Sequence, residues 1–345
     1  MKKLLVTAAA ILLVFALAGC GQSSKEELNI YNWGDYIGED VIAQFEEATG
    51  INVNYSTFAS NEEMYAKIKS GAGDYDVLFP SDYMIERMIA EDMLAEIDTA
   101  SLSGYDLIGS GFKDMAYDPT NSYSVPYMWG TVGILYNTSM VDEPVTSWDI
   151  LWDEKYSGQI FMYDSARDSM MVALKKLGYD INTRNEAEIE EAKQLLIDQS
   201  PLVLAYITDD GKDKMIAGEA ALAVVYSGDA METIWENEYL AYAIPEEGSN
   251  IWVDAMVIPK SSENYDNAVK FIEFMCSTDI AFENVDYICY STPQTEALAM
   301  VEDETMLGTS AFNPTDEEIA RCEVFNDLGE FKAVYDDAWL RVKVQ

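Results

Sequence analysis

Residues 28–90 have the sequence LNIYNWGDYIGEDVIAQFEEATGINVNYSTFASNEEMYAKIKSGAGDYDVLFPSDYMIERMIA. It contains three short apolar segments with the composition of strands, expected at 28–31, 51–55 and 76–79. Each is followed by a predicted helix, at 39–49, 60–70 and 82–90. This alternation predicts a parallel sheet covered by helices, because a helix is the usual crossover between parallel strands.

Two local signals support the helix boundaries in this stretch. Gly50 follows the first helical pattern, and glycine is the residue that most often ends a helix. Ser60 and Glu63 have the spacing of a capping box, so the second helix is expected to begin there.

A second region with the same alternation follows residue 128. Strands are expected at 160–162, 221–226 and 251–258, and helices at 168–177, 186–197 and 266–275. The chain shows no internal repeat and no low-complexity segment. Two α/β stretches of this size predict two lobes with a cleft between them, where ligands of α/β proteins usually bind.

The first residues are predicted to be a targeting segment. Lys2 and Lys3 precede an uncharged apolar run at 4–17, shorter than the about 20 residues that span a bilayer. The run ends in LAGC at 17–20, which has the form of a bacterial lipobox. We expect a signal peptide at 1–19, a lipid on Cys20 and a polar tether at 20–27. The alternative is an uncleaved anchor or a plain signal peptide.

This segment predicts the location of the mature protein. A lipid on Cys20 would hold the domain at an extracytoplasmic membrane face, in the periplasmic space or on the outer face of the cytoplasmic membrane. No later segment is apolar for long enough to suggest a second anchor.

The chain is strongly acidic, with 62 Asp and Glu against 21 Lys and Arg and a formal net charge of −41. Because phosphate binding requires basic patches, this charge argues against a nucleic-acid partner. A cationic ligand would fit, but an acidic surface for solubility explains most of the charge, and salt screens surface charges beyond about 8 Å. Only carboxylates inside a pocket therefore bear on the ligand.

The chain contains no histidine, which excludes Ser-His-Asp and Cys-His catalysis and His-ligated zinc sites. Beyond Cys20, the cysteines Cys276, Cys289 and Cys322 have no metal-like spacing. One disulfide with a leftover thiol and three buried thiols both remain open. No catalytic residue, no metal site and no cofactor is expected.

Two clusters of aromatic and polar residues directly follow predicted strands. Trp33, Asp35 and Tyr36 follow the first strand, and Ser81, Asp82 and Tyr83 follow the third. In open α/β sheets ligands bind at the carboxyl ends of the strands, so both clusters are expected at one ligand-binding edge. The alternative for the first cluster is a loop whose tryptophan covers the core.

Trp252 and Asp254 are two residues apart in a predicted strand, so their side chains are expected on one face. An acid within an apolar strand is costly unless a cation pairs with it. That cation is either a lysine or arginine of the protein or a ligand, and we favour the ligand.

Asp164 and Asp168 flank residues 165–167 where a predicted strand passes into a helix. Carboxylates at a helix start are commonly caps, so capping and ligand contact both remain open for this pair. Arg167 is expected to form an internal salt bridge.

These residue types suit a linear polyamine, which is a string of ammonium groups separated by methylenes. Aromatic faces cover methylenes and attract ammonium groups by cation–π contact. Carboxylates at spaced points hold the charges by charge-assisted hydrogen bonds. A sugar would also use tryptophan and aspartate, so this chemistry alone does not decide between them.

At these residues the chain resembles the spermidine/putrescine-binding proteins of bacterial ABC importers over most of the mature length. The motifs in its first half are YNWGDY at 31–36, EEATGI at 46–51, SNE at 60–62, PSDY at 80–83 and VPYMWG at 125–130. The later motifs are TSW at 146–148, SARD at 165–168, WVD at 252–254 and YSTP at 290–293. So many matches in the same order are far more specific than one short motif.

The resemblance implies a type II periplasmic-binding-protein fold, with two α/β lobes joined by crossing hinge strands and closing on ligand. It implies one lobe from 28–129 with 255–297, and a second from 130–254 with 298–345. The implied aromatic box comprises Trp33, Tyr36, Tyr83, Trp252 and Tyr290.

The resemblance also implies polar roles. Asp254 would hold the central amine, and Asp168 a terminal amine with help from Asp164. Ser81 and Thr208 would add hydrogen bonds. Tyr226 stands where the family often has tryptophan.

The chain also departs from the family. Gly34 stands in place of a common hydroxyl residue, and Ser165 in place of an acid that some spermidine binders use. Asp82 adds an acid where a neutral residue is usual. Trp339 and Leu340 do not match a polar contact residue. These departures bear on which polyamine is bound.

The implied function is capture of spermidine, putrescine or both, and delivery to an ABC permease with its ATPase, by a monomer without enzymatic activity. One alternative is a binding protein of the same fold for a sugar or a quaternary amine. Another is a secreted glycosidase, which would need two carboxylates about 5 to 9.5 Å apart.

Overall fold

The computed structural model describes residues 26–208 and 210–344. The predicted signal peptide at 1–19, the lipidation site at Cys20 and most of the predicted tether at 20–27 lie outside the described residues.

Within the described residues, nine strands form one mixed sheet in the order β2-β1-β3-β9-β4-β7-β5-β6, and β8 pairs with β4. The strands are β1 (Glu27–Trp33), β2 (Asn52–Phe58), β3 (Val77–Leu78), β4 (Ser124–Asn137), β5 (Ile160–Tyr163), β6 (Val203–Ile207), β7 (Leu222–Tyr226), β8 (Leu240–Ala243) and β9 (Ile251–Val257). β1 is parallel to β2 and β3, and β5 is parallel to β6 and β7. Each parallel group is one α/β half of the molecule.

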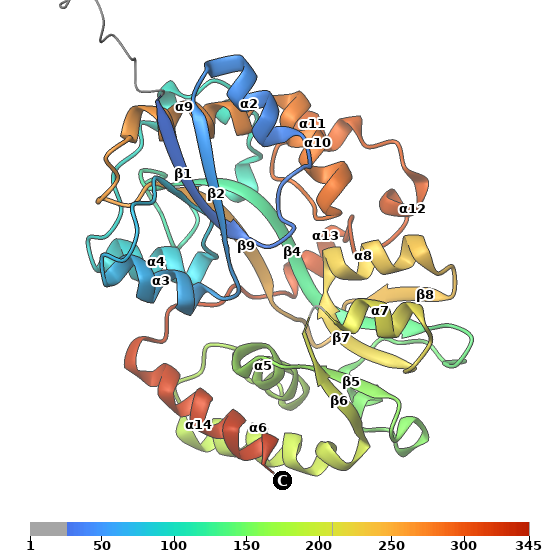
Figure 1. The fold of residues 1–345 in the computed structure, drawn as a ribbon. Helices are drawn as coiled ribbons and strands as arrows, with labels where there is room; N and C mark the ends of the chain where they lie inside the picture. The colour runs from blue at the N-terminus through green and yellow to red at the C-terminus, as the bar shows by residue number, and fades with distance from the viewer. Residues whose placement is uncertain (1–25, 209, 345) are drawn as a thin grey trace, which may run out of the picture.

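β4 and β9 connect the two halves. Residues 124–131 of β4 pair antiparallel with β9, whose far end pairs with β3. Residues 132–136 of β4 then pair with β7, and residues 134–137 pair with β8. Figure 1 shows the two strands passing side by side from one half to the other. The predicted two-lobed α/β fold with crossing strands is confirmed.

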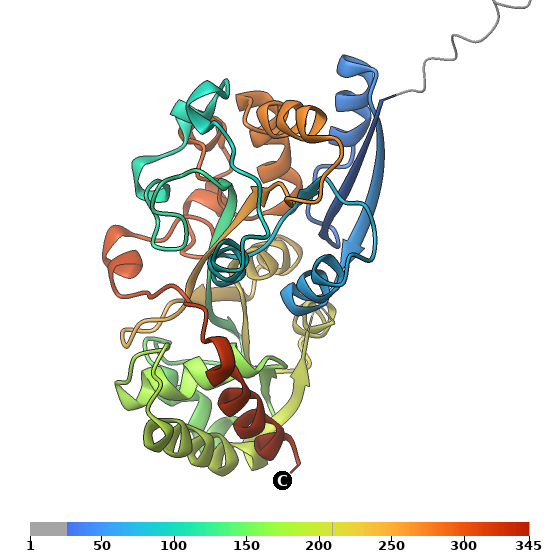
Figure 2. The same ribbon diagram turned by 90° about the vertical axis from the view of Figure 1, so that its left-hand side faces the viewer.

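The helices cover the two halves separately (Figures 1 and 2). The first half carries α2 (Val41–Thr49), α3 (Asn61–Lys69), α4 (Asp82–Ala90), α9 (Tyr265–Met275), α10 (Thr278–Ile288) and α11 (Thr295–Met300). The second carries α5 (Ala166–Leu177), α6 (Glu186–Gln199), α7 (Gly211–Ile216), α8 (Ser227–Glu236) and α14 (Lys332–Lys343). The short α12 (Glu304–Leu307) and α13 (Asp316–Ala320) lie on the path to α14, which packs on α5 and α6. The predicted lobe boundaries at 129/130, 254/255 and 297/298 stay a prediction.

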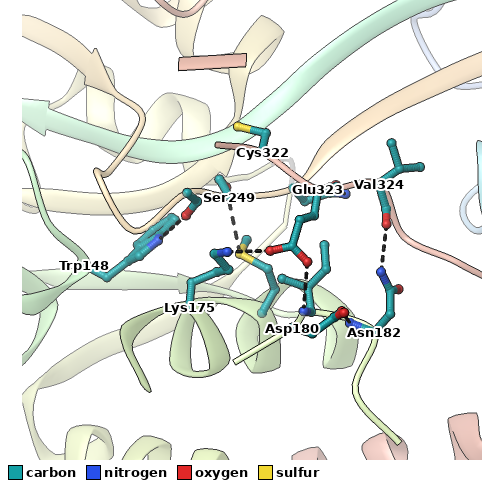
Figure 3. A network of polar contacts seen from close by, with 12 residues as sticks. Trp148, Lys175, Asp180, Asn182, Ser249, Cys322, Glu323 and Val324 are labelled. Carbon is teal, nitrogen blue, oxygen red and sulfur yellow. Dashed lines mark hydrogen bonds and ion pairs between the residues drawn. The ribbon is translucent and has the colours of Figure 1, made fainter. Parts of the chain in front are cut away.

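The chain passes the crossing a third time just before α14. The Glu323 amide donates to the Ser249 carbonyl, and the Ile251 amide donates to the Glu323 carbonyl. The Glu323 carboxylate lies 2.5 Å from Nζ of Lys175, which is mostly buried on α5. Figure 3 shows this ion pair with the hydrogen bond from Asn182 to the Val324 carbonyl. These contacts fasten the C-terminal segment to the second half where it meets β9.

All the predicted helices and strands are present. Gly50 ends α2 in the left-handed region at φ 76°, and α4 has the predicted bounds. The capping box is half formed, since Ser60 accepts from the Glu63 amide while the Glu63 carboxylate accepts from the Ala59 amide. β3 is shorter than predicted, because the Asn29 amide bonds to the Asp76 side chain in place of a backbone partner.

The sequence patterns did not predict β4, although it is the longest of the described strands. Nearly every residue in it is buried, so it lacks the apolar–polar alternation that marks a half-exposed strand. It also contains Pro126, Gly130 and Gly133, which usually signal a break. The glycines permit close packing instead: a Cβ on Gly130 would lie 2.5 Å from Ser227 Oγ and 2.7 Å from the Trp252 ring.

Two further expectations concern cysteines and membranes. Cys276, Cys289 and Cys322 are all free, and burial raises the pKa of their thiols to about 12, 12 and 11. Of the two alternatives that the sequence left open, a disulfide among these three cysteines is therefore excluded, and all three are free thiols. None of the helices in 26–208 and 210–344 combines the length and apolarity needed to cross a bilayer.

Gly130→Ala is expected to lower the free energy of unfolding by about 1–3 kcal/mol, because its methyl group would overlap Ser227 and Trp252. Gly111→Ala is the matched control, since no atom lies within 4 Å of the added Cβ there. Urea denaturation of both variants measures the difference. Equal stability of the two variants would contradict close packing at the crossing.

Candidate ligand-binding site

A continuous chain of aromatic rings lies where the two halves meet. Its successive members, each in ring contact with the next, are Tyr127, Tyr36, Tyr290, Trp252, Tyr226 and Tyr163. The ring centroids are 5.5, 5.8, 5.1, 6.1 and 4.9 Å apart in that order, and every pair meets edge to face. Each such ring pair stabilises the fold by about 0.5–1.5 kcal/mol beyond the contribution of its buried area. These contacts therefore help to fix the positions of the six rings.

The topology explains why these rings meet. Tyr36 follows the carboxyl end of β1, while Tyr163 and Tyr226 are the last residues of β5 and β7. Trp252 lies on β9 at the crossing, and Tyr290 follows α10. The carboxyl ends of both parallel groups therefore point at the crossing strands, which is where α/β proteins bind ligands.

Asp254 lies in this region as a buried acid without a cation. It is only 5% exposed, and its Oδ1 has no hydrogen-bond partner. Burial raises the pKa of Asp254 to about 7, against the opposing effect of the Ser81 and Tyr36 hydroxyls. The Trp252 Nε1 is also buried without a partner. Trp252 and Asp254 share a buried face of β9, as predicted, and Asp254 forms no ion pair within the described residues.

Asp168 is the second such acid. It is 4% exposed, its Oδ2 accepts from the Tyr226 hydroxyl at 3.0 Å, and its Oδ1 has no partner. Burial raises the pKa of Asp168 above its ordinary value. The N-cap of α5 is Ser165, whose Oγ accepts from the Asp168 amide. Capping therefore does not account for the buried carboxylate of Asp168.

Two other predicted acids already have partners in the protein. The Asp164 carboxylate lies 2.6 Å from Lys343 Nζ of α14. Asp82 is buried and accepts from the amides of Tyr83 at 2.7 Å and Val253 at 3.1 Å. Burial raises the pKa of Asp82 to about 8. Asp82 therefore ties the start of α4 to β9.

Of the remaining predicted site residues, Ser81 lies beside Asp254, whereas Trp33 packs in the core. Ser81 lies beside Asp254 as its bridge partner and is held by Asn61. Trp33 donates to the Phe79 carbonyl at 2.8 Å and packs on Phe58, a core contact.

Three other predicted residues are not members of the ring chain. Tyr83 packs against the cores of both halves. Asp35 and Thr208 are exposed, and Asp35 has a left-handed φ of 47°. The structure does not bring Asp35 or Thr208 into contact with the ring chain.

The expected salt bridge of Arg167 is wrong. Its guanidinium donates to the Asn326 carbonyl and the Asn182 side chain, and it lies 4.2 Å from the Phe325 ring centroid. Carbonyl oxygens and an aromatic face thus take the place of an acid. Burial lowers the pKa of Arg167 from its ordinary value.

Two ring-chain residues were not among the predicted site residues. Tyr163 ends the strand predicted at 160–162, so the rule that selected Tyr36 would have found it. Tyr127 lies in β4, and its hydroxyl donates to the Tyr36 carbonyl at 3.0 Å. Since β4 was not predicted, no pattern placed Tyr127 near the site.

Residues 40–307 match the family model described as bacterial extracellular solute-binding protein. The spermidine/putrescine-binding periplasmic proteins of Salmonella typhimurium and Escherichia coli are 34% and 33% identical to the chain, over 97% of each protein.

Solved structures agree with these sequence matches. The spermidine/putrescine ABC transporter substrate-binding protein PotD of Streptococcus pneumoniae has a TM-score of 0.83 and 41% identity. A putative spermidine/putrescine ABC transporter protein of Listeria monocytogenes has a TM-score of 0.86 and 39% identity. Each match covers 92% of this chain and 99% of the other.

Proposed function

The chain belongs to the family of bacterial extracellular solute-binding proteins, and from that premise we propose that it captures a polyamine of the spermidine/putrescine class and delivers it to an ABC importer. The observation that carries the proposal is the pair Asp254 and Asp168. Both are buried, each has one oxygen without a partner, and a chain of rings connects their surroundings. The relatives named for spermidine and putrescine support it.

The chemistry of the region fits a cationic chain molecule. Burying a carboxylate without a cation is costly, so an arriving ammonium group restores a favourable state through a charge-assisted hydrogen bond. The edges and faces of Tyr226, Trp252 and Tyr290 provide apolar surface for methylenes. Cation–π contact adds up to about 2 kcal/mol for a desolvated ammonium group. A neutral sugar would leave both acids without a counter-charge.

Capture is proposed to involve movement of the two lobes about β4 and β9. The site residues come from both halves, so a ligand that contacts both stabilises the closed arrangement. Closure would then be the state that the importer's permease recognises, with its ATPase driving transport. The protein itself would act as a monomer without catalysis.

A lipid on Cys20 is proposed to keep the protein at the extracytoplasmic face of a membrane, on the strength of the LAGC motif at 17–20. In cell fractionation, Cys20→Ser is expected to move the protein from the membrane to the soluble fraction. Membrane retention of this variant would contradict lipid anchoring at Cys20.

Asp254→Asn is expected to weaken binding of putrescine and spermidine by about 2–5 kcal/mol, because it removes a buried partner of a cation. Isothermal titration calorimetry measures the loss. Asp164→Asn is the control, since Lys343 already occupies that acid, and it should bind normally. Wild-type protein that binds maltose or choline but neither polyamine would contradict the proposed function.

A further inference from the structure

We propose that Glu62 and Glu86 of the first half and residues 323–332 of the second half form a latch that holds the two halves together, so that side chains outside the ring chain help to set the affinity for ligand. This inference rests on the proposed function, because it concerns the lobe movement that accompanies capture. It depends on how firmly residues 323–332 are attached to the second half and on two polar contacts that they make with the first.

The first part of this segment is fixed to the second half. Asn182 donates to the Val324 carbonyl at 2.9 Å and accepts from the Asn326 amide at 2.8 Å. Figure 3 shows the first of these bonds beside the ion pair that the segment forms with α5. Further along, the Leu328 side chain is buried in the core of the second half. The segment therefore belongs mechanically to the second half.

Helix α4 of the first half contacts the same segment. The Asp327 amide donates to the Glu86 carboxylate at 2.7 Å. Both residues are half-buried, and a bond from an amide to a carboxylate is about twice as strong as one between neutral groups. Figure 1 shows the segment passing beneath α3 and α4 on its way to α14. Because the partners belong to different halves, this bond forms only while the halves lie together.

Helix α3 adds a second contact at the start of α14. Lys332 Nζ lies 3.7 Å from the Glu62 carboxylate and 2.9 Å from that of Asp336. An ion pair this exposed contributes little by itself. It nevertheless places opposite charges on the two facing halves, so its attraction acts in the same direction as the bond from Asp327 to Glu86.

A latch of this kind acts on every ligand that requires closure. Contacts made only in the closed arrangement raise the fraction of closed protein, and the apparent affinity is proportional to that fraction. Neither Glu62 nor Glu86 belongs to the ring chain. Loss of the latch should therefore weaken the binding of different polyamines by the same factor, whereas damage to the ligand site would change their ratio.

The variant Glu86→Ala tests the latch by calorimetric titration with putrescine and with spermidine. Both should bind about tenfold more weakly, by factors that agree within about twofold, because a hydrogen bond to a charged group is lost. Alanine is a good helix former, so α4 should keep its fold, which thermal unfolding without ligand checks. Affinities within about twofold of the wild type would overturn the inference. Failure of the wild-type protein to bind either polyamine would instead refute the proposed function.

Two further variants show whether the lost bond is the cause. Glu86→Gln keeps an oxygen that accepts from the Asp327 amide, so it should lose only about threefold in affinity. Glu91→Ala, at the end of the same helix, removes contacts with Tyr65 and Lys69 that lie within the first half, and it should bind normally. A tenfold loss in Glu91→Ala, or equal losses in Glu86→Gln and Glu86→Ala, would overturn the inference.

The ion pair is tested by its dependence on salt. Lys332→Gln should weaken putrescine binding about twofold at low ionic strength, and this difference from the wild type should vanish at about 1 M NaCl, where exposed charges are screened. A difference of the same size at both salt concentrations would overturn the role of the ion pair between Lys332 and Glu62.

Discussion

The antiparallel pairing of β4 with β9 holds the two halves of the protein together and determines which residues meet at their junction. It joins two parallel groups of strands whose carboxyl ends point toward the crossing from opposite sides. Side chains that follow those ends, including Tyr36, Ser81 and Tyr226, therefore meet Trp252 and Asp254 on β9. Gly130 allows β4 to lie close against Trp252, so the ring chain is packed against the crossing strands.

Two buried carboxylates destabilise the protein electrostatically where the two halves meet. Asp254 and Asp168 are buried and form no ion pair within the described residues, although Asp164 pairs with Lys343 and Glu323 pairs with Lys175. These two ion pairs show that lysines are available close to the region, so a shortage of lysine does not explain why Asp254 and Asp168 are unpaired. The proposed polyamine would supply cations to both acids, and their aromatic environment fits such a ligand, since rings stabilise both methylenes and ammonium groups.

Much of this arrangement could be predicted from the sequence, because helix ends and strand periodicity depend on residues close together in the chain. Gly50 and Ser60 marked helix ends, and the two-residue spacing of Trp252 and Asp254 placed them on one face. What could not be predicted depends on packing between distant segments. β4 is buried on both faces, so its sequence lacks the apolar–polar alternation that marks a strand. The contact of Tyr127 with Tyr36 could therefore not be predicted. Arg167 was assigned a salt bridge, whereas backbone carbonyl, amide and ring contacts from residues far along the chain hold it.

The proposed function predicts that Asp254, whose pKa is raised by burial, loses its proton when an ammonium group of a polyamine binds beside it. Burial raises the pKa of Asp254 to about 7, and a bound ammonium group would lower it, so binding should release protons at pH 7 and below. Calorimetry of putrescine binding at pH 6.5, in buffers of different ionisation enthalpy, measures this release directly. We expect release of about half a proton or more per ligand, declining above pH 8. No net proton release at pH 6.5 would contradict this prediction, because Asp254 would then already be ionised before the ligand binds.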